Sequence, residues 1–547
     1  DLLCYENAWL TVDEIVQAME QSMEGHPQSV ILTLSEIIRF FSKDDFTAVF
    51  QKISELESPV HLRKRIYVPL VGLSERFVSN FFNSFYRQRE WAPIWQLVPV
   101  EPIRKAKLYI TPFKIVQQSN YKVLEDTRQW LNSWKSNPVD PVICCSLTLS
   151  LLYKNALPDQ IFDIELLFDR KQLVKRLFDI DLTFDYMVEH DVFWDKLIQI
   201  CIENPGLSLE QLLRKVMNVA TIDTSDVINT WSTSEDDFKK WLLKAWFLGK
   251  NEFKRTYLHK VLGATQTLEK SEFCKNLWLQ VFDSSDSNAY WEERETLLKL
   301  FYKYNPSFPT AYVDQVLPEK IAALDKDKQI KALTGLIDTE KGLLISLLIG
   351  GQLAKSLLVD KYEELEWYLA NLDLDDMNEQ KIWINDYFRK YKFSKLSDKI
   401  DPELSTLLAT KNSGSEAFYN WYYSFKTVAQ LLVEEKHDRV VWIDALGFEW
   451  APYIVNILER QMGFVVEKKF VARANIPSIT DNNRIPGATY IQDFDQIIHS
   501  DYKHPQSLIK QLSLVKTLIM NKIYVSDGQT VAIVSDHGTT ALARLQE

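Results

Sequence analysis

Cysteine is scarce in this chain, and the few cysteines are scattered along it. The five are Cys4, Cys144, Cys145, Cys201 and Cys274. No two of them have the spacing of a metal-ligand motif, so the sequence offers no cysteine-based zinc site. An odd, sparse set in a chain of 547 residues is typical of reduced thiols. It predicts a cytoplasmic location.

Long apolar runs and a leader segment are also missing. The most apolar stretch, residues 342–359, is interrupted by Gln352 and Lys355. We therefore expect a buried helix there and no membrane contact. The chain has no signal-peptide pattern, and it begins with Asp1 and not with methionine. We expect a fragment, or a protein whose upstream residues are missing here.

The chain has no excess of positive charge, since its formal net charge is −12. This charge argues against a broad electrostatic attraction to nucleic acid, although a local basic groove remains compatible with it. A phosphate-binding G-x-x-x-x-G-K-[ST] loop is absent from the sequence. At 547 residues the chain is too long for one core, so two to four domains are expected.

The patterning predicts a multidomain protein that combines α/β and all-α parts. Residues 1–120 are expected to form a small α/β domain, in which Ser42 is a helix N-cap. Residues 121–410 carry helical periodicity and predict an all-helical domain. The strands expected in the first domain lie at 29–34, 65–71, 95–100 and 108–110, and the clearest helical periods of the second lie at 210–219, 236–247 and 360–369.

The last part of the chain, residues 411–547, changes to strands that alternate with helices. One helix is expected at 415–434, with an aromatic face that packs in the core. A mostly parallel sheet covered on both faces is then expected. Its strands are predicted to end at Asp444 and to lie within 464–474, 489–491 and 530–535, with helices at 448–462 and 506–523.

Four short segments of this last part carry an acid, a hydroxyl or an imidazole near the end of an apolar run. They contain Asp444, Thr480, the pair Asp495 and His499, and the tripeptide Asp536–His537–Gly538. Reactive residues of parallel sheets gather at the carboxyl ends of the strands. Carboxylates, histidines and one threonine brought together there would suit a bridged metal pair.

Each segment also has an ordinary structural interpretation when it is taken alone. Asp444 could cap the following helix, and the threonine of Pro477–Thr480 could cap a turn. Ser478 is a rival nucleophile in the same turn, and Asp493 and His504 are rival metal ligands. The four segments in this order are a much stronger signal than any one of them.

The order Asp, Thr, Asp-x-x-x-His, Asp-His-Gly resembles the alkaline phosphatase superfamily, in particular its nucleotide phosphodiesterase-like branch. Segments 444–447, 477–480 and 535–538 look more closely like the PglZ proteins of BREX phage-exclusion systems. The resemblance covers about residues 438–547. It implies an alkaline-phosphatase-like domain at 411–547, truncated in this chain.

The resemblance also implies roles for single residues and two divalent metal ions, zinc foremost. Thr480 would be the metal-activated nucleophile, and Asn483 would help to hold a phosphoryl oxygen. The family pattern includes a further histidine well after the Asp-His-Gly segment, and no histidine follows Gly538 here. The second metal site is therefore expected to be incomplete. The implied ligands are Asp444, Thr480, Asp536 and His537 for one metal, and Asp495 and His499 for the other.

The resulting expectation is a metal-dependent phosphodiesterase or phosphatase of phage defence, acting on a nucleotide or nucleic-acid substrate beside other phage-defence proteins. The alternative is a scaffold subunit of a phage-defence complex, with an inactive or incomplete metal site. A sulfatase of the same superfamily is disfavoured because no cysteine lies beyond Cys274. A phosphomutase is disfavoured because the segment after Thr480 is short for a mobile cap.

Overall fold

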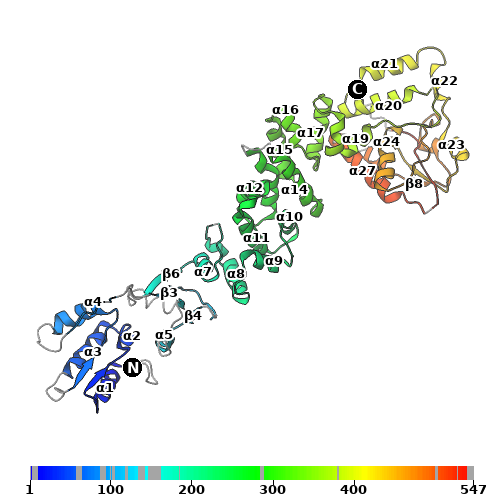
Figure 1. Ribbon diagram of the computed structural model, residues 1–547. Helices are drawn as coiled ribbons and strands as arrows, with labels where there is room; N and C mark the ends of the chain where they lie inside the picture. Colours follow the sequence, from blue (N-terminus) through cyan, green and yellow to red (C-terminus); the bar gives the residue numbers. More distant parts are fainter. Residues whose placement is uncertain are drawn as a thin grey trace. The chain divides into compact units, whose positions relative to one another are not determined.

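The computed structural model describes most of the chain, and the chain divides into two compact units. The first unit comprises Asp1–Thr230 with Ser234–Lys254, and the second comprises Trp231–Thr233 with Arg255–Glu547. Each unit is described by itself (Figure 1). The described residues are 2, 10–56, 64–86, 94–98, 100, 105–117, 121–133, 142–145, 162–183, 185–283, 289–378, 381–498, 503–526 and 528–538.

The first unit combines parallel sheets with helices, and an α/β pattern was predicted for its residues 1–120. Its described strands form a two-stranded sheet, β1-β2, and a four-stranded sheet of order β4-β5-β3-β6, and all pairs are parallel. The strands are β1 Gln28–Val30, β2 Arg65–Tyr67, β3 Ala106–Ile110, β4 Lys122–Leu124, β5 Val142–Cys145 and β6 Phe162–Leu166. The helices are α1 Val12–Met23, α2 Leu34–Ile38, α3 Lys43–Glu55, α4 Ser74–Phe77, α5 Thr127–Ser133, α7 Arg170–Phe178, α8 Asp191–Glu203, α9 Leu209–Met217, α10 Thr224–Thr233 without its last three residues, and α11 Asp237–Gly249.

Local signals account for several of these elements. The Ser42 side chain caps α3 by accepting a hydrogen bond from the Asp45 backbone N–H, as predicted. Strands β1, β2 and β3 overlap three of the predicted runs. The described part of 95–100 forms no strand, and the Trp95 and Leu97 side chains there are 67% and 87% exposed. Strands β4, β5 and β6 lie within residues 121–410, where only helices were predicted, so that prediction was wrong for this part of the segment. The domain limits at 120 and 410 stay a prediction.

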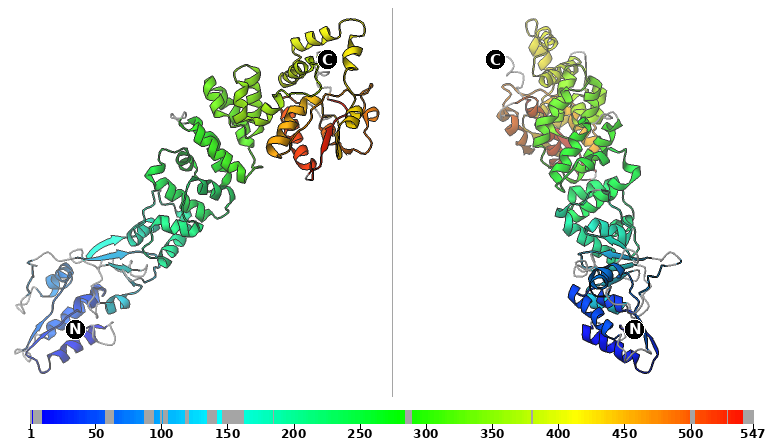
Figure 2. Two further views of the ribbon diagram at one scale, coloured as in Figure 1. Left: turned by 45° about the vertical axis from the view of Figure 1, so that its right-hand side comes forward. Right: turned by 90° about the vertical axis from the view of Figure 1, so that its left-hand side faces the viewer.

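The amino-terminal part of the second unit is built from helices that pack against their neighbours in sequence. Figure 2 shows them following one another along the chain from green to yellow. Their contacts run through α12 with α13, α13 with α14 and α15, and α15 with α17. The helices are α12 Tyr257–Ala264, α13 Lys270–Leu279, α14 Trp291–Tyr304, α15 Ala311–Ala322, α16 Lys326–Ala332, α17 Asp338–Ile349, α18 Leu358–Lys361, α19 Glu363–Leu369, α20 Trp383–Ser397 and α21 Pro402–Lys411.

The apolar stretch 342–359 is not one continuous buried helix, and that prediction was wrong. Helix α17 ends at Ile349, and the chain turns through Gly350 and Gly351 before α18. Gly351 has a φ of +68°, in the left-handed region that glycine adopts without steric cost. Within the described residues, no helix is both long and apolar enough to cross a membrane.

The predicted helix at 415–434 is two helices, α22 Ala417–Tyr422 and α23 Val428–Glu434. The break lies where the Thr427 side chain forms a capping box with Gln430 and so starts a new helix. Just before this break, the Lys426 carbonyl accepts a hydrogen bond from the Arg473 backbone N–H, so it bonds to a distant segment of the chain. Of the predicted aromatic face only Phe425 is fully buried, whereas Phe418 is 45% exposed.

The carboxyl-terminal sheet has three described strands in the order β8-β7-β9, and both pairs are parallel, as predicted. No strand forms within 464–474, where that prediction was wrong, because this segment bonds to residues 375 and 426 instead of to the sheet. Helices α24 and α27 are joined by a hydrogen bond from the Tyr453 hydroxyl to the Leu512 carbonyl. The elements are β7 Arg439–Ile443, the 3₁₀ turn η10 Phe448–Trp450, α24 Ala451–Asn456, the π-helical turn η11 Ile457–Gln461, α25 Thr480–Asn483, β8 Thr489–Ile491, α26 Asp493–Ile498, α27 Gln506–Lys522 and β9 Val531–Val534.

Candidate metal centre

Two acidic residues lie side by side at one edge of the carboxyl-terminal sheet. Asp444 directly follows β7, and Asp536 lies two residues after the end of β9. The two strands are parallel neighbours, so their carboxyl ends meet at the same edge. Both residues are buried, with exposed fractions of 5% for Asp444 and 4% for Asp536.

The loop after β7 is tied to the loop after β9 by the Asp536 carboxylate. Asp536 Oδ1 accepts hydrogen bonds from the Ala445 backbone N–H at 3.2 Å and from the His537 backbone N–H at 2.9 Å. Ala445 has a φ of +58°, which is uncommon for a residue with a side chain. In this conformation the Ala445 N–H points at Asp536, so the strained backbone at Ala445 allows the hydrogen bond that joins the two loops.

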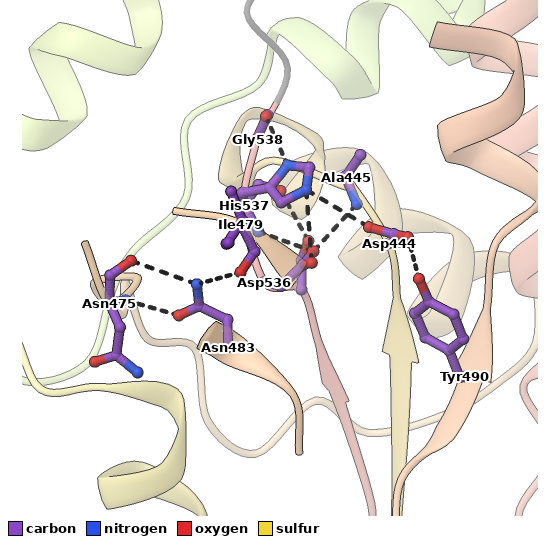
Figure 3. Close-up of polar contacts among 10 residues, drawn as sticks. Asp444, Ala445, Asn475, Ile479, Asn483, Tyr490, Asp536, His537 and Gly538 are labelled. Carbon is purple, nitrogen blue, oxygen red and sulfur yellow. Dashed lines mark hydrogen bonds and ion pairs between the residues drawn. The ribbon is translucent and has the colours of Figure 1, made fainter. Parts of the chain in front are cut away.

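The His537 imidazole completes a group of three potential ligands (Figure 3). Its Nε2 lies 3.6 Å from Asp444 Oδ1 and 3.5 Å from Asp536 Oδ2. One ligand atom from each of the three residues lies within 4.8 Å of the others. Two carboxylates and an imidazole are a donor set that zinc and other divalent transition metals bind.

The carboxylate oxygens that face this group are otherwise unsatisfied. Asp444 Oδ1 and Asp536 Oδ2 are buried and have no hydrogen-bond partner among the described residues. Burial raises the pKa of Asp444, and the neighbouring charges of Asp536 and Asp495 raise it further. Two buried, like-charged carboxylates whose facing oxygens lack donors are costly unless a cation lies between them. The residues present therefore fit a divalent cation.

Tyr490 belongs to this site, and the sequence analysis missed it. Its hydroxyl donates a hydrogen bond to Asp444 Oδ2, which leaves Oδ1 of the same carboxylate free. Tyr490 lies on β8 opposite Trp442, which is two residues before Asp444 and therefore on the same face of the sheet. The strand register would have identified Tyr490, but a single sequence does not fix that register.

Tyr490→Phe is expected to weaken divalent-metal binding while leaving the fold in place. The variant loses only the hydroxyl that orients the Asp444 carboxylate, and its ring can still pack 4.7 Å from that of Trp442. Loss of a group that orients a metal ligand typically costs about 10–100-fold in metal affinity. Isothermal titration with Zn²⁺ measures the effect. An unchanged affinity in the folded variant would mean that Tyr490 does not orient the ligand.

Asp444→Asn is expected to raise the melting temperature of the metal-free protein. The raised pKa means that ionised Asp444 destabilises the folded state above that pKa, and this cost fades as the pH falls through it. The asparagine removes the repulsion from Asp536. In chelator, the melting temperature is expected to rise by roughly 2–4 °C for each kcal/mol by which the substitution stabilises the folded state. The rise is expected to be largest at about pH 8 and smallest near about pH 4. A lower melting temperature at about pH 8 would contradict this cause.

The predicted catalytic pair Thr480 and Asn483 lies on the short helix α25. Asn483 Nδ2 donates to the Ile479 carbonyl at 3.0 Å, and its Oδ1 accepts from the Asn475 backbone N–H at 2.7 Å. Figure 3 shows the Asn483 side chain bonded within its own loop and not to the carboxylates. Thr480 is half-buried and has no hydrogen bond to the three-residue group in the described part of the chain.

Of the remaining predicted ligands and their rivals, the structure describes Asp495, Asp493 and His504. Asp495 lies in the first turn of α26, close enough to Asp444 to raise its pKa. His499 lies outside the described residues. The rival ligand His504 is engaged elsewhere, because its Nε2 lies 2.7 Å from the Leu396 carbonyl. Asp493 and the rival nucleophile Ser478 are exposed.

Comparison with known proteins gave no match to a family model, to a curated protein or to a solved structure.

Proposed function

We propose that this chain carries a divalent-metal phosphodiesterase or phosphatase site at the edge of its carboxyl-terminal sheet. The observation that carries the proposal is the pair of unsatisfied, buried carboxylate oxygens on Asp444 and Asp536, with the His537 imidazole beside them. The resemblance of the surrounding motifs to PglZ proteins supports the same chemistry, with zinc as the first metal to test. A nucleotide or nucleic-acid phosphodiester is the proposed substrate.

Asp444, Asp536 and His537 would hold one metal ion, and Asp495 would contribute to a second. Bound metal would supply a Lewis acid that polarises a phosphoryl oxygen and lowers the pKa of a nearby hydroxyl. Thr480 is the proposed nucleophile, and Ser478 is its rival. Tyr490 keeps Asp444 oriented, and the two backbone N–H groups on Asp536 Oδ1 keep its Oδ2 facing the site.

Hydrolysis of an aryl phosphodiester tests the proposal directly. The protein is stripped with chelator, and activity on bis(p-nitrophenyl) phosphate is measured as Zn²⁺ or Mn²⁺ is restored. We expect no hydrolysis without metal and saturable hydrolysis with it. Absence of hydrolysis at every metal concentration, together with no metal binding by titration, would overturn the proposal. It would leave the scaffold interpretation, whose own test is a stoichiometric partner that co-purifies with an Asp536→Asn and His537→Ala double variant.

A further inference from the structure

A buried ion pair lies next to the loops that carry the candidate metal ligands. Lys395 belongs to α20 and Glu449 to η10, and their side chains are 1% and 3% exposed. Lys395 Nζ lies 3.8 Å from Glu449 Oε1, and neither atom has a hydrogen-bond partner in the described residues. Lys395 Nζ also lies 4.7 Å from the centre of the Trp450 ring.

Stability explains this pair poorly. Burial raises the pKa of Glu449 and lowers that of Lys395, so the surroundings oppose both charges. At 3.8 Å, with no hydrogen bond on Lys395 Nζ or Glu449 Oε1 in the described residues, their attraction offsets little of that cost. Apolar residues of similar size often stabilise a protein as well as a buried ion pair does, or better. The Lys395–Glu449 pair is therefore expected to have a role other than stabilisation.

The Glu449 carboxylate packs against the contact between the two ligand-bearing loops. A Cβ atom on Gly447 would lie 2.1 Å from Glu449 Oε2 and 3.0 Å from Gly538 Cα. Gly447 has a φ of −59° and a ψ of 159°, which other residues also adopt. Glycine therefore fits at position 447 because there is no room for a Cβ atom, and not because of the backbone conformation. Gly447 is three residues after Asp444, and Gly538 directly follows His537.

We propose that Glu449, held by Lys395, is a positioning residue for the candidate metal centre. Its carboxylate fixes the Gly447 backbone against Gly538, and this contact sets the separation of Asp444 from His537. The inference rests on the proposed function, because it concerns the same metal centre. Lys395 belongs to α20, so a helix outside the ligand-bearing loops would also help to position the site. A ring contact at 5.0 Å between Phe388 and Phe448 joins α20 to η10 as well.

The Lys395→Met and Glu449→Leu double variant separates positioning from stability. The apolar pair is expected to melt at or above the temperature of the parent in chelator, because two buried charges are removed. Its affinity for Zn²⁺ or Mn²⁺ by isothermal titration is expected to fall about 10-fold or more, because the loop contact is no longer fixed. A pair that serves stability alone would give the reverse, a lowered melting temperature with the affinity of the parent.

Glu340→Gln is the matched control in the same unit. Glu340 is 0% exposed and its pKa is raised by burial against the charge of Arg294, so it resembles Glu449 in its surroundings. It accepts hydrogen bonds from the Thr334 hydroxyl and the Leu336 N–H, neither of which belongs to the ligand-bearing loops. Glu340→Gln is expected to lower the melting temperature and to leave metal affinity unchanged.

Two single variants keep the proposal falsifiable if the double variant does not fold. Glu449→Gln keeps the shape and removes the charge, and Gly447→Ala forces the carboxylate aside. Both are expected to lose metal affinity. Affinity within about twofold of the parent, in the folded double variant or in both single variants, would overturn the positioning role. A parent that itself binds no metal would instead overturn the proposed function, so titration of the parent distinguishes the two failures.

Discussion

Asp536→Asn is expected to remove metal binding and phosphodiester hydrolysis together. Asparagine can still accept the N–H groups of Ala445 and His537 through its Oδ1, so the two loops stay tied. The substitution replaces the unsatisfied Oδ2, which faces Asp444 and His537, with an uncharged NH₂ group that cannot serve as a metal ligand. We expect kcat/KM on bis(p-nitrophenyl) phosphate to fall about 1,000-fold, equivalent to about 4 kcal/mol of transition-state stabilisation.

Asp438→Asn is the control for this substitution, because Asp438 lies at the opposite end of β7. Its carboxylate accepts a hydrogen bond from the Thr530 backbone N–H at 2.7 Å. The same change of charge there is expected to leave metal affinity and kcat/KM as in the parent. Metal-dependent hydrolysis that survives Asp536→Asn would exclude Asp536 as a ligand.

The three-residue group was predictable because its signals are local. Asp444 and Asp536 each follow a short apolar run, and such runs are typical of strands in a parallel sheet. In a parallel sheet the strand ends meet at one edge, so two acids in that position are expected to be neighbours. The structure brings them together with His537 as that rule requires.

Contacts between distant segments could not be predicted in this way. Tyr490 reaches Asp444 only because β8 pairs with β7 in one particular register. Lys395 and Glu449 belong to segments that no short motif connects, and a lysine on a helix is ordinarily a solvated side chain. Tertiary packing places both of them in the interior, next to the loops of the site.

Short-range hydrogen bonds overturned the predicted single helix at 415–434, and they also hold Asn483 within its own loop. Thr427 and Gln430 form a capping box that starts a helix inside a stretch with continuous helical periodicity. Asn483 has polar partners four and eight residues away, namely the Ile479 carbonyl and the Asn475 backbone. Its predicted contact with a phosphoryl oxygen stays a prediction. Hydrophobic periodicity indicates which face of a segment is apolar. It does not indicate where a side chain forms hydrogen bonds with nearby backbone groups and so ends or starts a helix.

Thr480→Ala is expected to slow hydrolysis severely while the loop around it keeps its shape. The loop is held by other groups, since Asn482 Nδ2 donates to the Pro477 carbonyl and Asn483 Nδ2 donates to that of Ile479, both at 3.0 Å. If Thr480 is the nucleophile, its removal is expected to lower kcat about 1,000-fold, because water then attacks without the covalent step. Metal affinity by titration is expected to fall far less than it does in Asp536→Asn.

Ser478→Ala and Thr480→Ser complete this experiment, because they test the rival nucleophile and the need for a hydroxyl. Ser478 is exposed in the same loop, and its substitution is expected to leave kcat within about twofold of the parent. Thr480→Ser keeps a hydroxyl and is expected to retain measurable hydrolysis. A trapped phosphoryl group on Thr480, detected by mass spectrometry, would identify the nucleophile directly. Full activity in Thr480→Ala would assign the attack to Ser478 if Ser478→Ala is inactive, and to water if that variant is active too.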